Sequence, residues 1–185
     1  YIQTPGSADM KFGNKVEPFN IKIAEEQVGE INEVGFKHYP EMPTLGASSD
    51  GFCKNKNAVV ENKACTNWET HFIRSYETID DKSTDFWQTQ LEMMVYNVDS
   101  CIYIISEPPK SIYDYLNEEK DFEDFRKECE VNIRYLKSAP IHQKAMLERV
   151  KIVEATCSEF LDNEQKNLKE ILHEQIKKFK QKRLG

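Results

Sequence analysis

Three residues in the first half of the chain have types and a spacing that suit chemistry on a phosphodiester: Asp50, Glu61 and Lys63. Residues 58–63 are rich in valine and predict a strand, so the side chains of Glu61 and Lys63 share one face of it. A carboxylate there can bind Mg²⁺ or Mn²⁺, which prefer oxygen ligands. The lysine can orient an attacking water or stabilise negative charge in the transition state.

A predicted hairpin places Asp50 beside this strand. Residues 46–51 are turn-type residues at the end of a short strand, and residues 55–57 are typical of a hairpin turn. Such a hairpin would bring Asp50 alongside Glu61, where two carboxylates can share a metal. Taken alone, a Glu-x-Lys pair is more often part of a solvated strand face, so this trio needs support from its surroundings.

The elements around the trio follow from hydrophobic spacing. Apolar residues three and four apart predict a helix over 8–27, which Pro18 starts or kinks. Residues 30–37 predict a strand, and 64–82 are mixed and include a loop. Ser83 or Thr84 is expected to cap a helix that runs to about Asn97.

The second half of the chain begins with a buried strand. The continuous apolar run at 100–106 predicts that strand, and alternation over 129–135 predicts another. Pro140 opens a long helical tract that Asp162 and Asn163 are expected to break. Its basic end, 177–183, is interpreted as a helix terminus rather than a DNA contact.

Composition indicates one domain over residues 1–185, without a membrane span or a leader. The five cysteines are scattered and lack metal-site spacing, which indicates reduced thiols in a cytoplasmic protein. The net charge of −7 argues against a protein that coats nucleic acid by charge alone. It leaves room for an acidic metal site.

Three segments resemble the phage lambda exonuclease type of viral recombinase nuclease, a YqaJ-like family of the PD-(D/E)xK superfamily. They are Leu-Gly-Ala-Ser-Ser-Asp-Gly-Phe at 45–52, Val-Val-Glu-Asn-Lys at 59–63 and Gln-Thr-Gln-Leu-Glu-Met at 88–93. Phe12-Gly13 followed by Glu17 resembles the family's aromatic-Gly-x-x-x-Glu helix. The resemblance covers about residues 8–106, in the family's order and spacing.

The resemblance implies roles for particular residues. It implies a metal site held by Asp50, Glu61, Glu17 and the backbone carbonyl of Asn62, and catalytic roles for Asp50, Glu61, Lys63 and Gln88. Gln90 and His71 are additional candidates, although an ordinary helix face and a structural histidine are the alternatives. Two departures are Ser49, where the family has proline, and Asn62, where it has an apolar residue whose amide would need partners. No DNA-contacting residue is predicted.

The implied fold is α/β, a restriction-endonuclease-like core with a central mixed sheet flanked by helices and an α-helical C-terminal tail. The catalytic core would occupy about 8–106, and a strand and helices about 111–185. The implied activity depends on Mg²⁺, with Mn²⁺ as a substitute. It is a 5′→3′ exonuclease on double-stranded DNA ends that leaves 3′ single strands for recombination.

The family also implies a single-strand annealing protein as a partner and a homo-oligomer, often a trimer. The place of action would be the cytoplasm of a bacterium or a virus-infected cell, or the nucleus or viral factory of a eukaryotic host. Two alternatives stay open: another nuclease of the superfamily, such as a RecB-like, Cas4-like or endonuclease member, and a catalytically silent DNA-binding module of the same fold.

Overall fold

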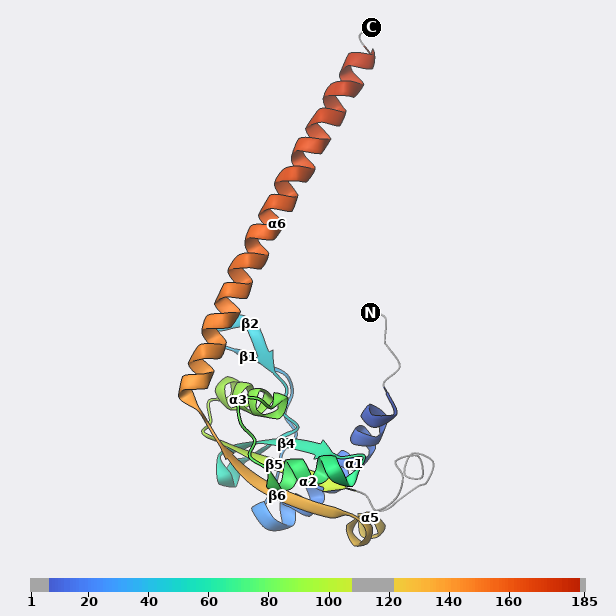
Figure 1. The fold of residues 1–185 in the computed structure, drawn as a ribbon, viewed down its shortest axis with the longest axis vertical. Helices are drawn as coiled ribbons and strands as arrows, with labels where there is room; N and C mark the ends of the chain where they lie inside the picture. Colours follow the sequence, from blue (N-terminus) through green and yellow to red (C-terminus); the bar gives the residue numbers. More distant parts are fainter. Residues whose placement is uncertain (1–6, 108–121, 184–185) are drawn as a thin grey trace. The chain divides into compact units, whose positions relative to one another are not determined.

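The computed structural model describes residues 7–107 and 122–183 (Figure 1). Contacts divide the chain into two compact units, Tyr1–Gln143 and Lys144–Gly185, so the prediction of a single domain stays a prediction. The first unit contains a helix–hairpin–sheet core and the start of the last helix. The described part of the second unit, 144–183, is the rest of that helix.

The first unit mixes helices and strands along the chain. In chain order they are α1 (Ala8–Val28), β1 (Lys37–Tyr39), β2 (Met42–Ala47), β3 (Gly51–Cys53), a 3₁₀ turn (Lys54–Lys56), β4 (Ala58–Ala64), α2 (Trp68–Tyr76), α3 (Thr84–Tyr96), β5 (Ser100–Glu107), α5 (Phe122–Glu128) and β6 (Glu130–Lys137). The last helix, α6, spans Pro140–Arg183.

A four-stranded mixed sheet in the order β3-β4-β5-β6 forms the centre of the first unit. The β3–β4 and β5–β6 pairs are antiparallel, whereas β4 and β5 are parallel and are connected through α2 and α3. Strands β1 and β2 form a separate antiparallel pair. The predicted mixed sheet flanked by helices is therefore confirmed.

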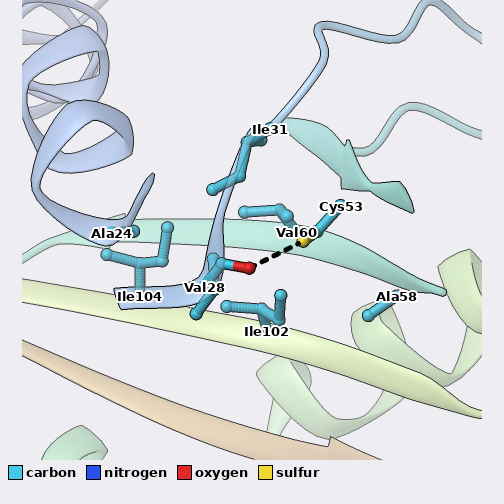
Figure 2. Packing of buried hydrophobic residues seen from close by; sticks show 8 residues of the cluster. All are labelled: Ala24, Val28, Ile31, Cys53, Ala58, Val60, Ile102 and Ile104. Atoms are coloured by element: carbon cyan, nitrogen blue, oxygen red, sulfur yellow. Dashed lines mark hydrogen bonds between the residues drawn. The ribbon is translucent and has the colours of Figure 1, made fainter. Parts of the chain in front are cut away.

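The two faces of the sheet bury different helices. On one face, Ala24 and Val28 of α1 pack with Val60 of β4 and Ile102 and Ile104 of β5, as Figure 2 shows. The thiol of Cys53 donates to the carbonyl of Val28 in this cluster (3.6 Å). On the other face, Val59 and Cys101 pack against Met93 of α3. Because side chains alternate along β4, Glu61 and Lys63 lie on the α3 face.

Several predicted boundaries are confirmed by local chemistry. Helix α1 matches the predicted 8–27, and Pro18 lies inside it rather than at its start. Ser83 caps α3, with its side chain accepting from the Asp85 amide (3.2 Å). The helix ends at Tyr96, and the following residue, Asn97, is its C-cap with a positive φ of 58°, which asparagine tolerates.

Two predictions about elements are wrong, and one is incomplete. Most of 30–37 is not strand; only an isolated bridge at Asn32 and the start of β1 fall there. The segment 64–82 does include the expected loop, at 77–82, but it also contains helix α2, which was not predicted and whose N-cap Asn67 accepts from the Thr70 amide (2.9 Å). No break occurs at Asp162 and Asn163, because both residues are compatible with a helix interior when exposed. Most of 111–126 lies outside the described residues.

The second unit carries exposed apolar side chains along its helix. They are Ile152, Val153, Phe160, Leu161, Leu168, Ile171 and Leu172. Within the part of the chain that the structure describes, no helix is long and apolar enough to cross a bilayer.

Candidate active site

The β3–β4 hairpin brings Asp50 beside Glu61. Gly51 pairs with Val60 in the antiparallel register, and continuing that register by one position sets Asp50 against Glu61. The Asp50 amide donates to the Val60 carbonyl (3.0 Å), which extends the pairing to the residue just before β3 begins. The hairpin predicted from the turn residues at 55–57 is confirmed, with Asn57 in the left-handed region at φ 46°.

Ser49 fixes the entry to this hairpin with its side chain. Its buried hydroxyl bonds with the carbonyls of Val60 (2.7 Å) and Gly51 (3.0 Å) and lies 3.3 Å from the Val60 amide. The nuclease pattern that this segment resembles has a proline here, whereas this chain has a serine that makes a cross-strand hydrogen bond. The position of Asp50 is thus set by a polar contact rather than by a rigid ring.

The carboxylate of Asp50 points along β4 towards a surface hollow. Its Oδ2 accepts from the Asn62 amide (2.7 Å). The hollow, about 460 Å³, runs between the start of α1 and the end of β4, and its lining includes Glu17, Asp50, Glu61, Lys63 and Arg74. The first helix, the hairpin and the helix after β4 thus all contribute to one concave surface.

Glu61, Lys63 and Gln88 form a connected polar group on the α3 face. The Lys63 ammonium lies 2.6 Å from Glu61 Oε1 and donates to Gln88 Oε1 (2.8 Å). The Gln88 amide donates in turn to Glu61 Oε1 (2.7 Å) and to Glu92 Oε1 (3.1 Å). Glu61 is only 2% exposed, so its charge is compensated mainly by Lys63 and this amide.

Acidic groups crowd around this network. Burial, and then the charge of Glu61, raise the pKa of Asp50 to about 7. The same two causes raise the pKa of Glu92 well above its usual range and that of Glu17 more modestly. Glu61 Oε2 and Glu92 Oε2 are both buried without a hydrogen-bond partner, so a proton on Glu92 is the simplest donor between these two carboxyls.

A second polar group adjoins the first through Asp85. Its carboxylate accepts from the Tyr103 hydroxyl (2.7 Å) and from Arg74 Nε (2.9 Å), and it lies 4.0 Å from the Lys63 ammonium. Burial alone would raise the pKa of Asp85, but the Tyr103 hydrogen bond and the Arg74 charge lower it below its ordinary value. Asp85 is therefore ionised at neutral pH and neutralises part of the positive charge near Lys63.

Asn62 faces the opposite side of β4 and finds the partners that a buried amide needs. Asn20 of α1 donates to Asn62 Oδ1 (2.7 Å) and to the Ser106 hydroxyl of β5 (2.8 Å). This bond ties α1, which carries Glu17, to the two central strands. The side chain of Asn62 is structural here, while its backbone carbonyl remains a predicted metal ligand.

The structure does not bring His71 or Gln90 into this group. His71 is buried on α2, 3.4 Å from Glu107 Oε2 and 3.4 Å from the Asn132 amide. Gln90 donates to the Lys137 carbonyl (2.9 Å) and accepts from the Ala139 amide (2.7 Å), so it joins α3 to the end of β6. Both side chains have structural partners that sequence spacing could not reveal.

Glu92, Asp85 and Arg74 were not among the sequence-based candidates. Asp85 and Glu92 lie three residues before and four residues after Gln88, which places all three on one face of α3. The sequence did offer a signal for Asp85 and Glu92, namely their helical spacing from Gln88 among positions that the helix buries. No sequence signal pointed to Arg74, because helix α2, which carries it, was not predicted.

The residues that line the hollow fit a hard divalent cation in part. Asp50, Glu61 and Glu17 offer only oxygen donors, which suit Mg²⁺ or Mn²⁺. Among residues 7–107 and 122–183, however, no three histidine, cysteine, aspartate or glutamate side chains converge closely enough to hold an ion by themselves. The arrangement therefore fits an ion held by two carboxylates and completed by water, as Mg²⁺ often is.

Comparison with solved structures identifies proteins of the same fold. The alkaline exonuclease LHK-Exo from Laribacter hongkongensis is 19% identical, with a TM-score of 0.56 over 83% of this chain and 77% of that one. Its complex with dAMP aligns similarly, at 20% identity. A phage-related exonuclease from Haemophilus somnus 129PT has a TM-score of 0.60 at 13% identity, over 82% and 71% of the two chains.

These likenesses confirm the predicted nuclease-type α/β fold, and they support the resemblance seen in the sequence at the level of the fold. No protein-family model matches the chain, and no curated protein sequence matches it.

Proposed function

We propose that this protein is a metal-dependent exonuclease that acts on double-stranded DNA. The observation that carries the proposal is the meeting of Asp50 and Glu61, on neighbouring strands, with Lys63 and Gln88 beside one open hollow. A fold shared with phage-type exonucleases supports it. A silent binding module would have no need for a buried carboxylate paired to a lysine beside an acidic hollow.

In this proposal, Asp50 and Glu61 hold the ion, with Glu17 and the Asn62 carbonyl as further donors. Bound Mg²⁺ or Mn²⁺ would supply positive charge to offset the charge that develops on the phosphate oxygens. Lys63 orients the attacking water and holds Glu61 in place through their 2.6 Å contact. Gln88 links Lys63, Glu61 and Glu92, so it keeps these groups in one arrangement.

The finer parts of the proposal come from the family resemblance. They are 5′→3′ polarity, a 3′ single-stranded product for recombination, an annealing partner and a ring-shaped oligomer, often a trimer. The place of action would be a bacterial or virus-infected cell. These parts can be tested separately from the cleavage chemistry.

The test is cleavage of end-labelled linear duplex and of closed circular DNA, each with Mg²⁺, Mn²⁺ or chelator. Linear duplex labelled at either 5′ or 3′ end reports polarity by the order in which label is released. We expect metal-dependent loss of linear DNA and survival of the circle. Cleavage of the circle would indicate an endonuclease, and no cleavage of either substrate with any metal would overturn the proposal.

A further inference from the structure

The acidic hollow contains two side-chain cations among its described lining residues, Lys63 and Arg74. A DNA phosphate that enters it meets the carboxylates of Glu17, Asp50 and Glu61, so cationic groups must offset the repulsion between like charges. The Lys63 ammonium already lies 2.6 Å from Glu61 Oε1 and donates to Gln88 (2.8 Å). Arg74 also pairs with a carboxylate, that of Asp85 (2.9 Å), but its guanidinium has further N–H donors and its side chain is more exposed than that of Lys63 (28% against 19%). Arg74 is therefore better placed to meet a phosphate.

The guanidinium of Arg74 is held in one orientation. Its Nε donates to Asp85 Oδ2 (2.9 Å) and its Nη1 lies 3.8 Å from the Cys65 thiol. Among the described residues, no partner is found for Nη2, and the side chain keeps 28% of its surface exposed. A guanidinium whose Nε is fixed by a carboxylate can still donate to a phosphate oxygen through its other nitrogens.

Asp85, which holds Arg74 in this orientation, is itself almost completely buried. It is 8% exposed and receives a hydrogen bond from the buried Tyr103 hydroxyl (2.7 Å). Because Tyr103 lies on β5, the direction of Arg74 is set by the rigid sheet rather than by its own helix. Asp85 is therefore a positioning residue for Arg74.

Arg74 also lies between two hollows. Besides the catalytic one, it lines a second hollow of about 370 Å³ between α2 and the start of α3, together with Thr70, Lys82 and Ser83. A DNA strand that crosses the catalytic hollow thus has a neighbouring space beside the same arginine. This position favours contact with the scissile phosphate or the phosphate next to it.

We propose that Arg74 binds a backbone phosphate of the DNA substrate, in an orientation held by Asp85 and Tyr103. This inference rests on the proposed function. The ligand class is a phosphodiester or terminal phosphate group of a nucleotide strand, and the contact does not depend on the base sequence.

The test measures binding of a short fluorescent duplex by anisotropy, with Ca²⁺ or chelator in place of Mg²⁺ so that no cleavage is needed. Arg74→Gln is compared with wild type, and Arg126→Gln is the matched control because Arg126 pairs with Glu26 on an exposed surface. We expect Arg74→Gln to weaken binding roughly tenfold to a hundredfold, as for a lost charged hydrogen bond. We also expect it to lower the salt slope by about one.

Two further variants separate charge from geometry. Arg74→Lys should keep the salt slope but bind less tightly, because the ammonium lacks the planar fork. Asp85→Asn should weaken binding less than Arg74→Gln while keeping the slope. Thermal unfolding shows which variants are folded, and Arg74→Lys carries the test if Arg74→Gln does not fold.

The outcomes distinguish this inference from the proposed function. Wild-type affinity and salt slope in Arg74→Gln, alongside metal-dependent cleavage by the wild type, would overturn the role of Arg74 alone. Wild-type affinity in Arg74→Lys would do the same if only that variant folds. Wild-type protein that neither binds nor cleaves duplex DNA would overturn the proposed function.

Discussion

The two faces of β4 use polar residues in opposite ways. On the α1 face, Asn62 bonds with Asn20, which also reaches Ser106, and these groups are neutral. On the α3 face, Glu61 lies beside Lys63, and the two carboxylate oxygens Glu61 Oε2 and Glu92 Oε2 stay without a partner. The α1 face also leaves one oxygen unpaired, Asn20 Oδ1, but that atom carries no formal charge.

The difference lies in how much charge is left uncompensated. Neutral amides and a hydroxyl that bond with each other hold the helix to the sheet and change little with pH. Crowded carboxyls beside an open hollow have raised pKa values, and a cation bound there, as proposed, would offset their charge. Strand β4 thus has neutral, mutually bonded polar side chains on one face and crowded carboxyls on the other, and most of the side chains in the proposed chemistry lie on the second face.

The largest expected effect is on the α3 face. Lys63→Met should lower metal-dependent cleavage by roughly a hundredfold to a thousandfold, the range for removing one group that stabilises the transition state. Lys56→Met, on the exposed 3₁₀ turn, is the control and should keep full activity. Single-turnover rates on linear duplex measure both, and equal rates for the two variants would contradict the division of the faces.

Metal affinity should depend on the protonation of Asp50. Its pKa is raised to about 7, so the ion competes with a proton below that pH. Affinity for Mn²⁺ should fall by about tenfold per pH unit below 7 and level off above it. Calorimetric titration at several pH values measures this, and a flat profile from pH 5 to 8 would argue against Asp50 as a ligand.

The same raised pKa has an opposite consequence for the metal-free protein. A carboxyl whose pKa is higher in the folded state stabilises the fold at low pH, and that contribution is lost as pH rises through about 7. Asp50→Asn should remove this dependence, so its thermal midpoint should exceed that of wild type most clearly above pH 7. Added Mg²⁺ should raise the midpoint of wild type but not of the variant.

A smaller effect is expected from Gln88, which supports the charged groups without being charged. Gln88→Met removes its bonds to Lys63, Glu61 and Glu92, and activity should fall about tenfold to a hundredfold. Gln27→Met, on the exposed part of α1, is the matched control. If cleavage rates of the two variants agree within twofold, Gln88 has no role in the site.

The smallest effect on activity is expected on the α1 face. Asn20→Ala leaves the side-chain oxygen of Asn62 without its hydrogen-bond donor. This should lower the free energy of unfolding by about 1–3 kcal/mol. Cleavage per folded molecule should stay within a few fold of wild type. Urea denaturation and cleavage rates together test this, and a large loss of cleavage in a fully stable variant would contradict it.

The sequence by itself determined the elements that depend on local pattern. The apolar spacing of α1, the Ser83 cap, the hairpin turn at 55–57 and the apolar run of β5 are all read within a few residues. It also determined that Glu61 and Lys63 share a face, because alternation along a strand is a local rule. Helix α2, within the segment 64–82, was not predicted because it is short and carries its apolar residues on an exposed side.

Only the tertiary structure decided which polar residues meet. The contacts Asn20–Asn62, Arg74–Asp85 and Tyr103–Asp85 join different elements, and no spacing along one element predicts them. For the same reason His71 and Gln90, both candidates from motif position, lie with structural partners elsewhere. Local pattern sets which face a side chain occupies, whereas packing of distant elements sets what that side chain can bind.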